Sequence, residues 1–398
     1  AVLTAPDSIA WLLNIRGSDI PFSPLALAFA IINTDNSVDL FVDKVKVSQK
    51  IKEHLGPDVR CHEPKAFGPA LDALENKTVR LNTETAPIYT LLRLETAGAA
   101  IQAGADPCQL PKAIKTSFQL NGIRAAHLRD GVSLTRFLAW LATNAAGGSL
   151  TERTAAKTLE SMRLNNKHFK GLSFPTISGA GPNGAIVHYS VSPKTDRLLE
   201  EGNLFLVDSG AQYLDGTTDV TRTVAIGTPT ESMVHHFTLV LKGHIALATA
   251  RFPEGTCGSQ LDVLARRALW AEGLDYDHGT GHGVGHFLSV HEGPQRISKI
   301  PNRVALQPGM IISNEPGYYK TGSYGIRIEN LVCVTAGPPL SFETLTLAPI
   351  DRALINTHLM EENEITWLNG YHARVLDKIS PLVDADTKSW LIKATATL

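Results

Sequence analysis

The stretch from Asp277 to Pro294 reads DHGTGHGVGHFLSVHEGP and places four histidines among closely spaced glycines. Imidazoles bind divalent cations and transfer protons near neutral pH, so this density of histidines indicates a segment that carries chemistry. The glycines follow the spacing G-x-G-x-G-x-G, which differs from the G-x-G-x-x-G and G-x-x-x-x-G-K-S/T phosphate-binding loops. We therefore reject a phosphate-binding cradle for this segment.

Four carboxylates lie near strand-like runs elsewhere in the chain. Asp208 ends the apolar run NLFLVDSG, and Asp219 opens the run DVTRTVAIG eleven residues later. An antiparallel hairpin of these two runs would bring both side chains to one end of a sheet. Glu315 and Glu329 are fourteen residues apart and repeat this arrangement in the runs GMIISNEPGYY and YGIRIENLVCV. Glu329 lies in a mostly apolar run, so its carboxylate needs a partner.

Four carboxylates and one histidine form an oxygen-rich set of ligands, which suits a pair of divalent cations. Carboxylates can bridge two ions, and such pairs lie about 3.5–4 Å apart in metal-assisted hydrolases. A single acidic residue at a strand end usually is solvated or caps a turn, but the coincidence of four favours a metal site. The sequence contains neither H-E-x-x-H nor G-x-S-x-G, so we expect water to be the hydrolytic agent.

The elements that must position these residues fall into two sections. Residues 1 to about 111 mix strand-like runs, among them IAWLLNI, LALAFAIINT and SVDLFVD, with the helical stretch FGPALDALENK. This section predicts a small α/β domain. A long helix is predicted from Pro111, which suits a first turn, and a domain boundary near residue 111 follows. Its apolar face is expected to contain Ile114, Phe118, Ile123, His127, Val132, Phe137 and Leu141.

Composition and charge limit the class of protein and its partners. The 398 residues are 43% hydrophobic and 19% charged, which is typical of a globular protein with two or three domains of roughly 100–200 residues. The formal net charge of −2 is spread along the chain, so neither nucleic acid nor a membrane is expected as a partner. The four cysteines lie far apart, which favours a reducing compartment. With no apparent secretion signal, a cytoplasmic protein is expected.

Several segments resemble those of the Xaa-Pro aminopeptidases (aminopeptidase P), metallopeptidases of the pita-bread fold. They are GPNGAIVHYS, LVDSGAQYLDGTTDVTRTVAIGTPT, LDYDHGTGHGVGHFLSVHEGP, GMIISNEPGYY and YGIRIEN. WLLNIRGSDIPFSP and WLNGYHARVLDKI extend the resemblance over nearly the whole chain and point to the long, cytosolic-type subfamily.

The resemblance implies an α/β (α+β) architecture with two domains in this chain. Residues 1–111 would be part of a creatinase-like N-terminal domain, the second of three in that subfamily, with Ala1 expected to be a truncation point. Residues 112–398 would be the catalytic domain, similar to creatinase and methionine aminopeptidase and built with pseudo-twofold symmetry.

The same resemblance implies a set of metal ligands. Asp208 would bind one ion, His282 and Glu315 the other, and Asp219 and Glu329 would bridge them. The cofactors would be two divalent ions, with Mn(II) expected and Zn(II) or Co(II) as alternatives. A bridging water or hydroxide would be the nucleophile, and Glu315 the general base.

Further residues around the ligands also match the family. His188, His278 and His291 would bind the substrate backbone and stabilise the oxyanion of the tetrahedral intermediate. Arg327 shares a strand face with Glu329 and would orient the carboxylates. His286 has no counterpart, and we expect a structural role for it.

The implied reaction is hydrolysis of the Xaa–Pro bond at the N-terminus of peptides with proline in second position. A homodimer formed through the catalytic domains is expected. One alternative is a proline dipeptidase, which cleaves only dipeptides. The other is a non-catalytic binding module on the same fold, which is disfavoured because all five ligand positions are filled.

Overall fold

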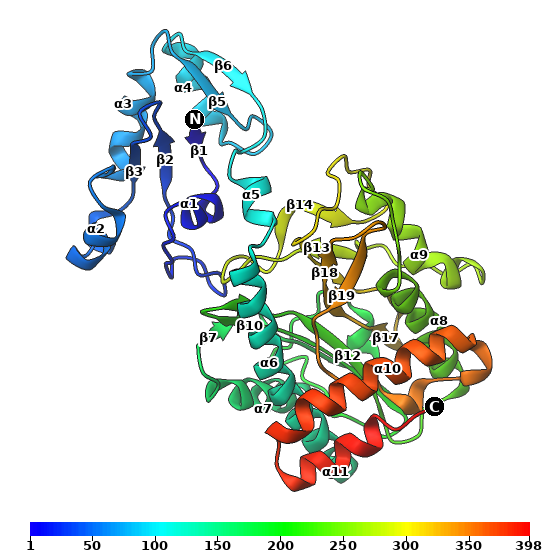
Figure 1. Cartoon of the computed structure of the whole chain (residues 1–398). Coiled ribbons are helices and arrows are strands. Elements are labelled where there is room, and N and C mark those ends of the chain that lie inside the picture. Colours follow the sequence, from blue (N-terminus) through cyan, green and yellow to red (C-terminus); the bar gives the residue numbers. More distant parts are fainter. The chain divides into compact units, whose positions relative to one another are not determined.

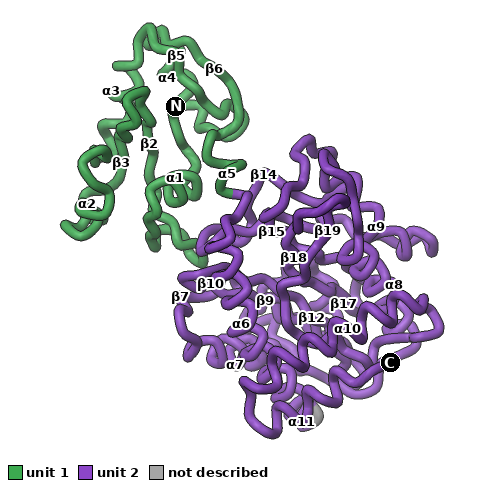
Figure 2. Tube along the Cα trace, viewed as in Figure 1, with its two compact units in different colours: residues 1–112 green, residues 113–398 purple. Residues whose placement is uncertain are grey.

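The computed structural model describes residues 1–145 and 147–398, and these form two compact units, residues 1–112 and residues 113–398 (Figure 2). Each unit has hydrophobic clusters of its own. Among the described helices, none is both long enough and apolar enough to cross a bilayer.

The first unit is built on one mixed six-stranded sheet in the order β4-β3-β2-β1-β5-β6. Its strands are β1 (Val2–Leu3), β2 (Phe29–Ile32), β3 (Val38–Phe41), β4 (Val59–His62), β5 (Thr78–Leu81) and β6 (Ala100–Ala103). Its helices are α1 (Pro6–Leu12), α2 (Gln49–Leu55), α3 (Phe67–Asp72) and α4 (Ile88–Thr96), and the boundary between the units falls within α5 (Gln109–Ala113). The expected α/β architecture of this section is confirmed.

The run IAWLLNI was predicted as a strand, and this prediction was wrong because α1 covers most of it. Pro6 occupies the first turn of α1, where its missing N–H costs nothing. Ser8, Ile9 and Ala10 are buried whereas Leu12 is exposed, so the helix packs through its middle and not through its last residue. A short apolar run does not distinguish a strand from a buried helix.

The second unit surrounds several small sheets with long helices, as Figure 1 shows for α6, α8 and α10. The helices are α6 (Ser117–Asn144), α7 (Glu152–Leu164), α8 (Glu231–Ala248), α9 (Gly258–Trp270), α10 (Glu362–Ile379) and α11 (Ala385–Ala394). The strands of the first half are β7 (Phe169–Leu172), β8 (Ile177–Ala180), β9 (Asn203–Ser209), β10 (Ala211–Tyr213), β11 (Gly216–Thr217) and β12 (Val220–Ile226). Those of the second half are β13 (Gly281–Gly283), β14 (Glu292–Ile297), β15 (Ile311–Asn314), β16 (Gly317–Lys320), β17 (Tyr324–Arg327), β18 (Asn330–Thr335) and β19 (Ser341–Thr344).

Two of these sheets hold the candidate site. One has the order β12-β9-β8, and the other has the order β14-β13-β15-β18-β19. The largest hydrophobic cluster packs residues of α8 and α10 against strand β17, for example Phe237, Val375 and Ile326. Burial of these apolar side chains holds the helices against the strand and so stabilises both.

Helix α6 begins at Ser117, later than the predicted start at Pro111. The Thr116 hydroxyl accepts a hydrogen bond from the Gln119 N–H, and the Gln119 side chain accepts one from the Thr116 N–H, which completes a capping box. Because the helix starts there, Phe118 lies in its first turn and is 83% exposed, so its predicted burial was wrong. The face further along is buried as predicted at Ile123, His127, Val132, Phe137 and Leu141.

Candidate metal centre

Strands β9 and β12 place the first two carboxylates. They pair antiparallel with Thr221 opposite Asp208 and Val220 opposite Ser209, as the predicted hairpin requires. Asp219 directly precedes β12, so its side chain and that of Asp208 lie at the same end of this pair. Both residues are buried, and both line one cavity of about 560 Å³.

The other two carboxylates lie at breaks between strands. β15 and β18 pair up to Asn314 opposite Asn330, and a separate ribbon of β16 and β17 begins with Gly317 opposite Arg327. Glu315 follows β15 and Glu329 precedes β18. Each therefore lies at a junction between the five-stranded sheet and the two-stranded ribbon. The Glu329 N–H donates to the Thr221 carbonyl (3.2 Å), which ties this break to β12.

His282 stands in the middle of β13, between two close-packed strands. A side chain at Gly281 would come within 2.0 Å of the Ser313 carbonyl oxygen, and one at Gly283 within 2.1 Å of that of Glu292. The close approach of β14 and β15 therefore explains the glycines at positions 281 and 283. The His282 Nδ1 lies 3.0 Å from its neighbour's carbonyl at Gly283, which fits an Nδ1–H tautomer with Nε2 facing the carboxylates.

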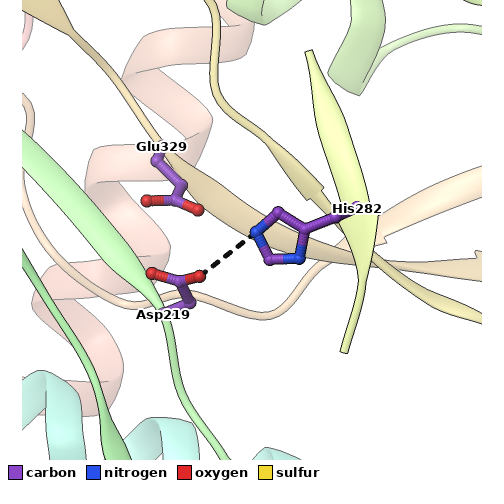
Figure 3. A group of neighbouring side chains, drawn as sticks. All are labelled: Asp219, His282 and Glu329. Carbon is purple, nitrogen blue, oxygen red and sulfur yellow. Dashed lines mark ion pairs between the residues drawn. The ribbon is translucent and has the colours of Figure 1, made fainter. Parts of the chain in front are cut away.

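The carboxylates of Asp219 and Glu329 and the imidazole of His282 point toward one another (Figure 3). Ligating atoms of Asp219, His282 and Glu329 all lie within 4.8 Å of one another. The His282 Nε2 is 3.4 Å from Asp219 Oδ2 and 3.4 Å from Glu315 Oε1. Asp208 also lines this cavity, so the structure brings all five predicted ligands together.

The electrostatics of this cluster fit divalent cations. Asp208 Oδ1 and Glu329 Oε1 are buried and have no hydrogen-bond partner among the described residues. Burial and the charges of Asp208 and Glu315 raise the pKa of Asp219 well above its usual value. Burial and the neighbouring Asp219 raise the pKa of Glu329 in the same way. Cations would remove this repulsion, and an oxygen-rich set with one imidazole suits such ions.

Arg327 links the carboxylates to a histidine through a tyrosine. Its guanidinium donates to Asp208 Oδ2 (2.7 Å), to the Tyr319 hydroxyl (2.7 Å) and to the Thr221 hydroxyl (3.1 Å). The Tyr319 hydroxyl in turn lies 2.8 Å from His278 Nε2. Burial, followed by the charge of Arg327, lowers the pKa of His278 to about 3, so this imidazole is neutral at pH 7.

Three residues that the sequence did not single out complete the hydrogen bonding. The Thr221 hydroxyl donates to Glu329 Oε2 (2.8 Å), and the Ser313 hydroxyl donates to Glu315 Oε1 (2.9 Å). Tyr319 joins Arg327 to His278 as described above. For Thr221 a weak signal existed, because it follows Asp219 by two residues on the same strand face.

Two further predicted histidines line the cavity, His188 and His291. The His291 ring meets that of His282 edge to face, with 4.3 Å between centroids. Burial, followed by the electrostatic interaction with the neighbouring His282, lowers the pKa of His291 to about 4. His286 is half-buried and, within the part of the chain that the structure describes, does not line this cavity.

The sequence matches three family models that together cover almost the whole chain. Residues 121–336 match the metallopeptidase family M24, and residues 338–398 match the C-terminal region of peptidase M24. Residues 1–119 match the creatinase/prolidase N-terminal domain.

Curated relatives cover the chain from end to end. Aminopeptidase P1 of Lotus japonicus is 40% identical over 99% of this chain and 71% of its own length. A probable Xaa-Pro aminopeptidase P of Aspergillus fumigatus is 43% identical over 100% of this chain and 64% of its own length. The chain thus spans about two thirds of the length of these relatives.

Solved structures confirm the expected fold. An X-prolyl aminopeptidase from Caenorhabditis elegans, described as a cytosolic enzyme with a di-nuclear active site, superposes with a TM-score of 0.94 and 38% identity. The match covers 100% of this chain and 68% of that one. The prolidase from Pyrococcus furiosus superposes with a TM-score of 0.66 and 25% identity over 87% of this chain and 95% of its own.

Proposed function

Because the chain belongs to metallopeptidase family M24, we propose that it is a Xaa-Pro aminopeptidase, which removes the first residue of peptides with proline in second position. The observation that carries this proposal is the convergence of four carboxylates, one imidazole and three further histidines on one cavity. The relatives of similar sequence are named as aminopeptidases of this kind.

We propose that five residues hold two divalent cations in this cavity. Asp208 would bind one ion, His282 and Glu315 the other, and Asp219 and Glu329 both. When bound, the two cations lower the pKa of a water molecule and so supply the nucleophile at neutral pH. Mn(II) is the proposed ion because hard oxygen ligands dominate, and Zn(II) or Co(II) could occupy the same ligands.

The chain's own residues orient the substrate and accept protons. The second carboxylate oxygen of Glu315 is available to take a proton, since the Ser313 hydroxyl occupies only Oε1. His291 is neutral at pH 7, so it can donate one N–H to a carbonyl oxygen of the peptide. The neutral His278 uses its Nδ1–H on the Gly279 carbonyl (2.9 Å) and its Nε2 on the Tyr319 hydroxyl (2.8 Å), so it would line the peptide site as a ring of fixed orientation. His188 stands on the exposed side of the cavity, where it would contact the peptide backbone. Arg327 orients the Asp208 carboxylate by donating to its Oδ2.

A proline dipeptidase is the second candidate, because the prolidase from Pyrococcus furiosus shares this fold at lower sequence identity. The decisive experiment loads the metal-free protein with Mn(II), measures the ions per chain by elemental analysis, and compares hydrolysis of an Xaa-Pro-Xaa tripeptide with that of the Xaa-Pro dipeptide. Cleavage of the tripeptide at its first bond supports the aminopeptidase. Turnover of the dipeptide alone would identify the dipeptidase.

Three further properties are proposed on the same basis. The division into domains at residues 111 and 112 is supported by the compact units, which meet at residue 112. A cytoplasmic location is supported by the cytosolic C. elegans relative. A homodimer through the catalytic domains is the assembly that we expect, and sedimentation of the purified chain tests it.

A further inference from the structure

A buried carboxylate behind the cavity holds the segment that carries His188. Glu152 is the first residue of helix α7 and is fully buried. Its Oε1 accepts hydrogen bonds from the Ala180 N–H (2.7 Å) and from the Asn183 side-chain amide (2.9 Å). Its Oε2 accepts from the Tyr189 hydroxyl (2.9 Å) and from the Arg197 N–H (3.0 Å).

These four donors lie at both ends and in the middle of segment 180–197. Tyr189 is buried at 6% exposure, whereas the adjacent His188 is exposed toward the cavity. The Asn183 amide and the Tyr189 hydroxyl also reach the Thr195 carbonyl, each at 3.0 Å. Segment 180–197 therefore wraps the Glu152 carboxylate with its hydrogen-bond donors. His188 lies on the opposite side of the segment, which faces the cavity.

We propose that Glu152 is a positioning residue, which fixes segment 180–197 so that His188 faces the metal ligands. This inference rests on the proposed function, because it assigns Glu152 a role through His188. A carboxylate suits the position, since it accepts at both oxygens and its charge is favourable at the N-terminus of the 13-residue helix α7. An amide would turn an NH₂ group toward either the Ala180 N–H or the Arg197 N–H and leave that backbone donor unsatisfied.

A double-mutant cycle separates positioning from a general structural role. Glu152→Gln and His188→Ala are made singly and together, and kcat and KM are measured on an Xaa-Pro-Xaa peptide with saturating Mn(II). In the wild-type background, we expect Glu152→Gln to lower kcat/KM by about tenfold. In the His188→Ala background, the same substitution should have almost no effect on kcat/KM, because Glu152 acts through His188 and the effects of coupled residues do not add. An equal factor in both backgrounds would overturn the proposal.

Asp351→Asn is the matched control, because Asp351 is another carboxylate that accepts two backbone N–H groups, from Ala225 (2.9 Å) and Ala353 (3.0 Å). It lies outside segment 180–197 and outside the cavity that holds the ligands. Any effect of this variant should be the same with and without His188. A control effect that also disappeared in the His188→Ala background would show that the cycle reports general instability, and it would count against the proposal.

Hydrogen exchange tests the same contact without turnover. Faster exchange of the backbone amides of segment 180–197 in Glu152→Gln, with the rest of the second unit unchanged, supports the proposal, and unchanged exchange in this segment overturns it. If Glu152→Gln does not fold, Tyr189→Phe removes one of the four donors and is measured in both assays by the same criteria. A wild-type chain without peptidase activity would refute the proposed function, and hydrogen exchange would still decide whether Glu152 holds the segment.

Discussion

Replacing Thr221 with valine should weaken the binding of divalent cations. Thr221 is fully buried, and its hydroxyl donates to Glu329 Oε2 and accepts from Arg327 Nε. Valine keeps the shape of threonine but removes both hydrogen bonds. The pKa of Glu329 is raised, so without a cation its carboxyl takes up a proton readily. Cations bind the ionised form, and this is the form that the hydroxyl stabilises.

The size of the effect follows from the groups left without a partner. Loss of a hydrogen bond to a buried polar or charged group costs about 1–3 kcal/mol. At about 1.4 kcal/mol per factor of ten, this corresponds to roughly 10- to 100-fold weaker binding, which is the range found for groups that orient metal ligands. We therefore expect the Kd for Mn(II) to rise by one to two orders of magnitude.

Calorimetric titration of metal-free protein with Mn(II) measures this change, and Thr223→Val is its control. Thr223 is also buried on β12, but its hydroxyl bonds only to the backbone of Arg327, donating to the carbonyl and accepting from the N–H at 3.0 Å each. Thr223→Val should lower Tm and leave the Kd unchanged. Equal Kd values for Thr221→Val and wild type, or equal losses in the two variants, would refute the reasoning.

Three other outcomes follow from the proposed roles. Asp219→Asn or Glu329→Gln should hold fewer than two ions per chain by elemental analysis, since a neutral amide bridges two cations poorly, and full occupancy with normal turnover would exclude a bridging role. His291→Ala should lower kcat and kcat/KM together by roughly 10²–10³-fold with metal content intact, whereas a rise in KM alone would indicate binding of the ground state only. His286→Ala should keep most of the activity, and a loss in kcat as large as that of His291→Ala would contradict its structural role.

Much of the metal centre could be predicted because antiparallel pairing has simple consequences. Asp208 and Asp219 flank a turn between two strand-like runs, so pairing of the runs necessarily brings them to one end. Glu329 was conspicuous as a charge in an apolar run. The assignment of each carboxylate to one ion or to both came from the family resemblance and not from spacing.

The surrounding hydrogen bonds could not be predicted from the sequence. Tyr319 and Ser313 are ordinary strand residues by composition, and their contacts with Arg327 and Glu315 depend on how two sheets meet. The helical state of IAWLLNI and the exposure of Phe118 were missed for a related reason. Both depend on where an element begins, and element boundaries are set by capping and packing more than by periodicity.

The breaks in the strands at Glu315 and Glu329 have a consequence for the lifetime of the folded protein. The ribbon of β16 and β17 has only two strands, and such ribbons open readily when isolated. Ions held at both of its junctions would have to dissociate before the ribbon could peel away from the five-stranded sheet, so the free energy of metal binding adds to the barrier for opening. With both ions bound, the ribbon and the five-stranded sheet would open only together, as one cooperative unit. Resistance to proteolysis would then depend on the concentration of divalent cations.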